Sequence, residues 1–126
     1  MIKIFGKIIF PDENAPKSLS DSSQMKVEFS DTSRADAPSV VLGSTLVDLT
    51  SYKNGTPLEY SITASKPQFL NDFYSVSAVL NVGWKPDVGG NEWLRKNDYL
   101  NDTMHTISLK PDQNEYEKDI EVIHYS

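Results

Sequence analysis

The chain has 126 residues, with 12 basic and 18 acidic side chains, a formal net charge of −6 and no cysteine. This length predicts one domain, covering residues 1–126. The absence of cysteine excludes disulfides, thiolate metal sites and cysteine nucleophiles. The acidic balance argues against nucleic-acid binding. No apolar run approaches the roughly 20 residues of a membrane-spanning helix, so we expect no transmembrane segment.

The first predicted strand covers residues 2–10, where apolar side chains alternate with polar ones. Gly6 interrupts the inward face, which predicts a bulge or a close approach of another backbone. Phe5 and Ile9 lie on the opposite face, which points outward unless a second sheet covers that face as well. Two lysines interrupt this run and no small-residue cleavage site follows it, so we expect no signal peptide in this chain.

Three further strands are predicted before the middle of the chain, separated by polar segments rich in serine and proline. The third contains a Gly43-Ser44 break, where a bulge or a change of sheet is expected. Asn54-Gly55 predicts a tight turn with positive φ angles. The three strands cover residues 25–29, 40–49 and 58–62.

The clearest alternation of the chain falls in residues 74–82, which predicts a half-buried and central strand. Residues 83–102 are irregular and contain both tryptophans. Two last strands are predicted at residues 103–109 and 116–125. Because no stretch has a sustained helical period, we predict an all-β fold, an antiparallel β-sandwich of about seven to eight strands. An eight-stranded barrel is the alternative.

No pattern of catalytic residues emerges from the sequence. His105 and His124 have no partner at a usual metal-ligand spacing, and each fits a solvated strand face equally well. The chain has no G-x-S-x-G motif and no glycine-rich phosphate loop before a helix. We therefore expect no enzyme, no catalytic residues and no metal ligands.

The irregular segment 83–102 carries the candidate ligand-binding residues. Its carboxylates offer hard oxygen atoms that suit calcium, although their spacing does not match an EF-hand. Its two tryptophans would stack on sugars or anchor a protein if exposed, or close the end of the core if buried. Apart from this possible calcium, no cofactor is expected. The candidates are Trp84, Trp93, Glu92, Asp98 and Asp102.

A second distinctive segment runs from Phe29 to Pro38. The side chains of Asp31 and Ser33 can accept hydrogen bonds from nearby N–H groups, which predicts a fixed turn. Pro38 fixes φ before the third strand. The prediction for this segment is structural, and its residues are Asp31, Ser33, Arg34, Ala35, Asp36 and Pro38.

The same segment resembles the signature L-x-D-x-S-x-A-D-A-P of the YbaY/YscW-like family of bacterial envelope lipoproteins, which includes type III secretion pilotins. Weaker similarities extend over roughly residues 2–110. The resemblance implies a β-sandwich outside the cytoplasm with no catalytic residues. Pilotin-type members bind a peptide of a secretin. The chain departs from the family in having no lipobox cysteine and a longer, tryptophan-bearing loop after its fifth strand.

These observations predict a non-enzymatic domain of an envelope protein or a secreted protein, acting through a protein partner. We expect a periplasmic or secreted location and a monomer or weak homo-oligomer. An open sheet edge is the expected binding surface, because a partner strand can be added there. The first and last strands are the candidates. The alternative function is a carbohydrate- or calcium-binding module built on residues 83–102.

Overall fold

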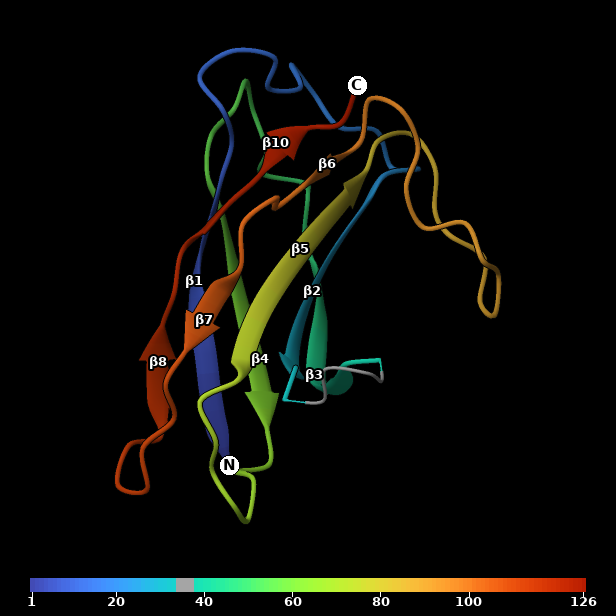
Figure 1. Ribbon diagram of the computed structural model, residues 1–126. Coiled ribbons are helices and arrows are strands. Elements are labelled where there is room, and N and C mark those ends of the chain that lie inside the picture. Colours follow the sequence, from blue (N-terminus) through green and yellow to red (C-terminus); the bar gives the residue numbers. More distant parts are fainter. Residues whose placement is uncertain (34–37) are drawn as a thin grey trace.

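The computed structural model describes residues 1–33 and 38–126 (Figure 1). Within these residues all regular secondary structure is β-strand, as the alternation predicts. The strands are β1 (Ile2–Ile9), β2 (Gln24–Asp31), β3 (Val40–Val47), β4 (Leu58–Ala64), β5 (Tyr74–Asn81), β6 (Tyr99–Leu100), β7 (His105–Ile107), β8 (Glu115–Glu117), β9 (Ile120–Glu121) and β10 (Ile123–His124).

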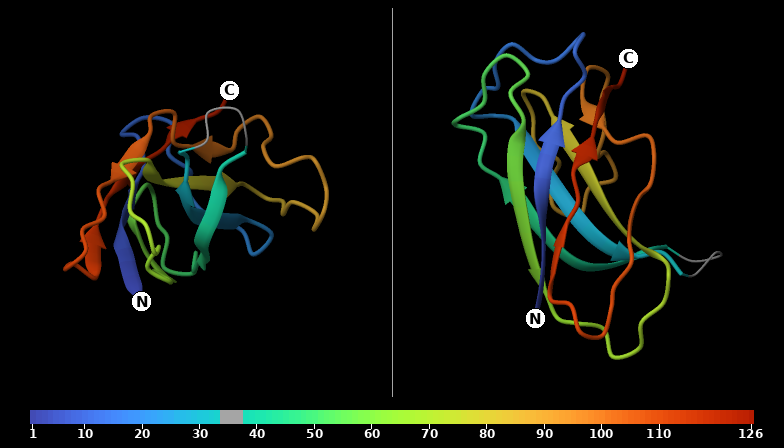
Figure 2. Two further views of the ribbon diagram at one scale, coloured as in Figure 1. Left: turned by 60° about the horizontal axis from the view of Figure 1, so that its bottom comes forward. Right: turned by 90° about the vertical axis from the view of Figure 1, so that its left-hand side faces the viewer.

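The strands form two sheets that lie face to face. One sheet has the order β4-β1-β8, and β9 also pairs with β1. The other has the order β10-β6-β5-β2-β3, and β7 also pairs with β5. The right-hand view of Figure 2 shows β4 (green) and β1 (blue) in front of β2 (light blue) and β5 (yellow), which they cross at an angle. The predicted β-sandwich is therefore confirmed, and the sheets do not close into a barrel.

The core lies between the two sheets and follows from the period-two pattern. Ile4 and Ile8 of β1 are fully buried, and so are Val27 and Phe29 of β2. Alternate side chains of a strand point to opposite faces, so the polar residues between these positions remain at the surface. Burying each large apolar side chain contributes about 1.5–3 kcal/mol, which makes this alternation the main determinant of the fold.

The prediction that the first strand is a free edge is wrong. β1 pairs with β4 along one side and with β8 and β9 along the other. The pairings with β8 and β9 are parallel, which adds a parallel component to a mainly antiparallel sandwich. Phe5 and Ile9 on its outward face are half-buried.

The last predicted strand, residues 116–125, is divided into three short strands. β8 and β9 pair with β1, whereas β10 pairs with β6 of the other sheet. The strand is interrupted between β8 and β9, at Lys118 and Asp119. There the Asp119 carboxylate accepts a hydrogen bond from the Lys7 N–H at 2.9 Å. The C-terminal segment thus crosses from one sheet to the other and links them.

The two glycine irregularities have separate structural causes. At Gly6 the pairing register of β1 and β4 is unbroken, and a Cβ atom there would lie 2.2 Å from the Lys118 carbonyl oxygen. Gly6 therefore permits a close backbone approach. Next to Gly43 the β2–β3 register shifts, which confirms the predicted bulge. A Cβ atom at Gly43 would lie 2.8 Å from Cγ2 of Ile62 in the facing sheet.

The predicted turn at Asn54-Gly55 is confirmed, with φ angles of 42° and 83°. The Tyr52 hydroxyl fastens this turn to the segment before β2. It donates a hydrogen bond to the Pro16 carbonyl oxygen and accepts one from the Gly55 N–H at 2.9 Å. Tyr52 also contacts the ring of Phe10 edge-on, with 5.1 Å between centroids.

Three tyrosines make the fold sensitive to alkaline pH. Burial raises the pKa values of Tyr52, Tyr60 and Tyr99, and at Tyr60 the negative charge of Asp119 adds to the effect. A raised pKa means that the folded chain keeps a proton that the unfolded chain loses near pH 10. The stabilisation is therefore complete below about pH 10 and declines as the pH rises further, through the folded-state pKa values.

We expect the urea midpoint to fall between about pH 10 and pH 11.5, and to fall less steeply for Tyr60→Phe. Tyr125→Phe is the matched control, because Tyr125 is 45% exposed and lysine deprotonation acts equally on both variants. Equal slopes for the two variants would show that Tyr60 does not contribute.

Candidate functional site

The structure describes the start of the Asp31 segment, up to Ser33, and its last residue, Pro38. The Asp31 carboxylate accepts hydrogen bonds from the Ser33 N–H at 2.9 Å and from the Asn71 side chain at 3.2 Å. Pro38 is exposed two residues before β3 begins. The described part of the motif thus ties the end of β2 to the segment that precedes β5. Arg34, Ala35 and Asp36 lie outside the described residues.

Asp98 is the centre of the loop that follows β5. Its side chain is only 1% exposed. Its carboxylate accepts hydrogen bonds from the Asn81 amide at 3.0 Å, the Val82 N–H at 2.9 Å, the Trp84 indole N–H at 3.0 Å and the Arg95 N–H at 2.8 Å. Each donor belongs to the same loop or to the end of β5. Asp98 therefore fixes the shape of the loop.

A second layer of this network lies around Trp84. The Arg95 guanidinium lies over the Trp84 ring, 4.0 Å from its centroid. Arg95 also forms a two-bond ion pair with Glu92, at 2.8 and 2.9 Å. These hydrogen bonds lower the pKa of Glu92 and raise that of Arg95. Both groups are exposed, so the ion pair orders the loop more than it stabilises the fold.

The structure brings only some of the candidate loop residues together. Trp84, Glu92 and Asp98 share one network, in which each polar group already has a protein partner. Trp93 is 56% exposed and Asp102 is exposed outside this network. Within residues 1–33 and 38–126, no group of three His, Cys, Asp or Glu side chains could hold a metal ion.

Neither histidine takes part in the hydrogen bonds around Asp98 and Trp84. The His105 Nε2 accepts a hydrogen bond from the Glu121 N–H at 3.3 Å, which ties β7 to β9. The His124 Nε2 lies 3.2 Å from the Asn97 side-chain oxygen. Both contacts join segments that are distant in sequence. His105 thus joins the two sheets, whereas His124 links β10 to the loop that precedes β6 within the larger sheet.

Two edges of the larger sheet carry exposed apolar side chains: β10, part of the predicted last strand, with Ile123 40% exposed, and β3, which exposes more of them. This strand pairs with β2 along one side, and no strand of the described chain pairs with its other side. Val40, Val41 and Leu46 are 48%, 50% and 63% exposed. An edge strand offers alternate backbone N–H and C=O groups to an added strand. The sequence analysis did not select this strand.

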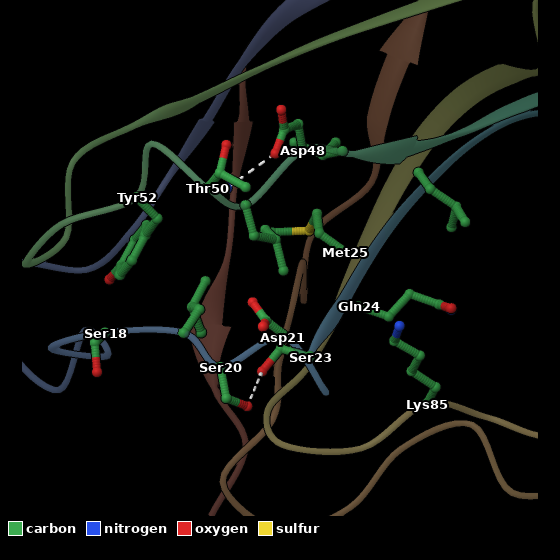
Figure 3. Close-up of a pocket in the computed structure, with 14 residues that line it drawn as sticks. Ser18, Ser20, Asp21, Ser23, Gln24, Met25, Asp48, Thr50, Tyr52 and Lys85 are labelled. Atoms are coloured by element: carbon green, nitrogen blue, oxygen red, sulfur yellow. Dashed lines mark hydrogen bonds between the residues drawn. The ribbon is translucent and has the colours of Figure 1, made fainter.

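A pocket of about 500 Å³ opens where β3 ends, and we call it the end pocket. It lies between the C-terminal half of β3 with the turn that follows and the segment that enters β2 (Figure 3). Figure 3 shows Met25 in the middle of the opening, with Tyr52 on one side. The residues that line it include Leu19, Met25, Val47, Leu49, Tyr52, Ser18, Ser20, Asp21, Asp48, Thr50 and Lys85.

The floor of the end pocket is the rim of the core, made of buried and partly buried side chains. Met25 is fully buried and Tyr52 is 7% exposed, whereas Leu19, Val47 and Leu49 are partly buried and pack against the core. Apolar floors with a few polar groups at the mouth are typical of binding pockets. The end pocket therefore offers apolar contacts to a side chain that enters from solvent.

The mouth of the end pocket is polar and slightly acidic. The Asp48 carboxylate accepts a hydrogen bond from the Thr50 N–H at 2.9 Å, which lowers the pKa of Asp48. Asp21 adds a second carboxylate and Lys85 a cation to the lining. The mouth thus carries one more negative than positive charge. It favours a neutral or basic entering segment over an acidic one.

A signal for this site is present in the sequence, but it is not specific. Residues 40–49 carry apolar side chains on both faces of the strand, around the Gly43 irregularity. A two-sided apolar strand is typical of a buried central position as well as of an exposed binding edge. The choice between them depends on which strands lie beside it, and that pairing is non-local.

Within the described residues, no helix combines the length and the apolar character required to cross a bilayer. No family model matches the chain. No curated protein matches it either. The resemblance of the Asp31 segment to the YbaY/YscW-like family therefore stays a prediction.

The fold is similar to a solved structure of an alternative pilotin from the type II secretion system of Vibrio cholerae. The TM-score is 0.66 with 22% sequence identity, and the match covers 97% of this chain and 96% of the pilotin chain. Nearly the whole of each chain thus takes part in the likeness. At this identity the likeness concerns the fold, and we conclude that the chain has a pilotin-like β-sandwich fold.

Proposed function

We propose that this chain is a non-enzymatic, extracytoplasmic protein-binding domain that adds an extended segment of a partner protein to the β3 edge. The observation that carries the proposal is the position of the end pocket directly beside the free half of β3. Strand addition supplies backbone hydrogen bonds, and an adjacent pocket for a side chain supplies specificity.

The geometry limits where such a segment can lie. Near Gly43, β3 approaches the facing sheet so closely that a Cβ atom would contact Ile62 and Ala64. Beyond that point, Leu46 and Val47 line the end pocket. The accessible part of the edge is therefore the second half of β3. A segment bound there can place one apolar side chain over Met25.

The likeness to a pilotin supports a secretion-related interaction and a location in the bacterial envelope. It is the basis for proposing the extracytoplasmic location. The slightly acidic mouth of the end pocket supports a segment in which the apolar residue is flanked by a basic or neutral one. The proposal therefore names an extended, apolar and non-acidic peptide as the ligand class.

A random-peptide display library selected on the protein is expected to enrich peptides with alternating apolar residues. Adding such a peptide should shift the NMR amide signals of residues 44–49. Leu46→Lys should weaken binding at least about tenfold, because an edge lysine opposes strand pairing. Ser18→Trp should also weaken binding, since Ser18 lines the end pocket and a larger side chain would fill its mouth.

The matched controls carry the same substitutions elsewhere. Thr63→Lys lies on the exposed face of β4, an edge strand of the facing sheet, and Ser108→Trp is exposed outside the end pocket. Neither control should change the affinity. Selected peptides that bind equally well to Leu46→Lys and Ser18→Trp would refute the proposed site. A dimer in sedimentation that Leu46→Lys abolishes would instead assign the β3 edge to a second copy.

A further inference from the structure

A second concave surface lies on the outer face of the β2–β3–β5 sheet, and we call it the outer groove. Its volume is about 500 Å³. Figure 1 shows the loop after β5 leaving the end of that strand and descending beside the sheet. The floor comes from β2 and β5 and the wall from this loop. The lining residues include Lys26, Glu28, Ser77, Val79, Val88 and Trp93.

The wall of the outer groove presents an aromatic face on a fixed backbone. Trp93 is 56% exposed, yet its carbonyl oxygen accepts a hydrogen bond from the Asn81 side chain at 3.0 Å. Asn81 is 2% exposed and is also bonded to Asp98. Binding to a preorganised wall avoids the entropy cost of ordering a loop. The exposed ring is thus available to a ligand without a rearrangement of its backbone.

The floor of the outer groove is polar, and its groups point to solvent. Outward-facing residues of β2 and β5 supply an ammonium group, a carboxylate and a hydroxyl, from Lys26, Glu28 and Ser77. The Lys26 Nζ lies 3.7 Å from the Glu28 Oε2, and the two side chains are 47% and 35% exposed. Such groups both donate and accept hydrogen bonds. Val79 provides an apolar strip between them and the end of the strand.

We propose that the outer groove binds a neutral glycan, with one pyranose ring stacked on Trp93 and its hydroxyl groups bonded to the floor. A sugar ring has an apolar C–H face and a rim of hydroxyl groups. This matches an aromatic wall that stands beside a polar floor. Glu28 and Asp87 outnumber the one lysine in the lining, so the groove disfavours anionic ligands.

This glycan site differs from the module expected from the sequence. Of the candidate loop residues it uses only Trp93, because Trp84, Glu92 and Asp98 are occupied within the loop. The remaining contacts come from β2 and β5, which the sequence analysis did not consider. The proposal is independent of the peptide site, since the end pocket and the outer groove share only Gln24.

The test is an NMR titration with tri-N-acetylchitotriose, maltotriose and xylotriose at millimolar concentration. The two indole N–H signals provide an internal control. At least one sugar should shift the Trp93 signal and the amides of residues 26–28 and 77–79, and leave Trp84 unchanged because its N–H is bonded to Asp98. Trp93→Ala should weaken binding at least about tenfold. Phe69→Ala, at an 82% exposed side chain elsewhere, should not.

Two results would overturn the glycan proposal. One is the absence of any shift at Trp93 with all three sugars, with the variant spectra showing that the fold is intact. The other is a Trp93 shift caused by choline but by no sugar, and lost in Glu28→Gln. That result would assign the outer groove to a cation, since tryptophan faces and carboxylates also attract cations.

Discussion

Replacing Asp98 with alanine is expected to lower the free energy of unfolding by about 3–5 kcal/mol. The carboxylate is 1% exposed and accepts hydrogen bonds from four donor groups. Alanine would leave those donors without partners, and each buried donor without a partner costs about 1–3 kcal/mol. The total loss is smaller than the sum of these costs, because water can reach part of the loop and pair with some of the donors. Urea unfolding of the two proteins measures the difference.

Asp102→Ala is the matched control, because that carboxylate is exposed. It should change the stability by less than about 0.5 kcal/mol. Asp98→Asn should be destabilised as well, since its amide nitrogen brings donors where acceptors are needed. In Asp98→Ala we also expect the Trp84 indole signal to move. Equal stabilities of the Asp98 and Asp102 variants would contradict the central role of Asp98 in the loop.

Gly6→Ala is expected to destabilise the fold by about 2–4 kcal/mol. The new Cβ atom would lie 2.2 Å from the Lys118 carbonyl oxygen and 2.7 Å from its carbon. Both are backbone atoms, so the connection between β8 and β9 would have to move. That connection is held by the Lys118 N–H on the Phe5 carbonyl, at 2.8 Å, and by the Tyr60 hydroxyl on the Lys118 carbonyl.

Gly89→Ala is the control for Gly6→Ala, because it has the conformational cost of losing a glycine without a clash of the new Cβ atom. Gly89 has a φ of 78°, and no atom lies within 4 Å of its added Cβ. Gly89→Ala should therefore lower the free energy of unfolding by only about 1–2 kcal/mol, which is the cost of the left-handed region for a non-glycine residue. Thermal unfolding of both variants gives the comparison. If Gly6→Ala were no less stable than Gly89→Ala, the close approach of Lys118 would not limit residue 6.

Asp98→Ala and Gly6→Ala also test how stability is related to the two proposed binding functions. Asp98 holds Asn81, and Asn81 holds the carbonyl of Trp93. Asp98→Ala should therefore weaken glycan binding at the outer groove even at temperatures where the sheets stay folded. Gly6 lies in the other sheet, at the joint between β1 and the C-terminal segment. Gly6→Ala should lower the stability with little effect on either binding surface.

The strands could be predicted because their signal is local. Alternation in residues 74–82 predicts a half-buried central strand, and β5 pairs with β2, β6 and β7. The bulge beside Gly43 and the turn at Asn54-Gly55 were also predictable, since glycine and asparagine tolerate backbone angles that other residues avoid. The split of the C-terminal strand was not. The residues of the interruption, Lys118 and Asp119, lie against Gly6 and Lys7, which are more than a hundred residues away in the sequence.

The candidate binding surfaces were less predictable than the fold. The hydrogen bond from the Ser33 N–H to Asp31 is local in the sequence, whereas the role of Asp98 required Asn81 and Trp84 to be placed around it. The sequence analysis considered Asp98 as a calcium ligand on an open loop. In the structure its carboxylate is buried among N–H donors, which gives it a structural role in the loop. A carboxylate in a polar loop has the same local pattern in both cases.

The sequence by itself determined that this protein is all-β, because side-chain alternation selects which face of each strand is buried, and the tertiary structure decided for a sandwich over a barrel. It also determined the acidic, cysteine-free character that excludes several kinds of chemistry. Only the tertiary structure decided that β1 is central and β3 is an open edge. It also decided that Trp84 is held within the loop while Trp93 faces solvent. These properties depend on which segments become neighbours in space, and contacts between distant residues leave no periodic signal in the chain.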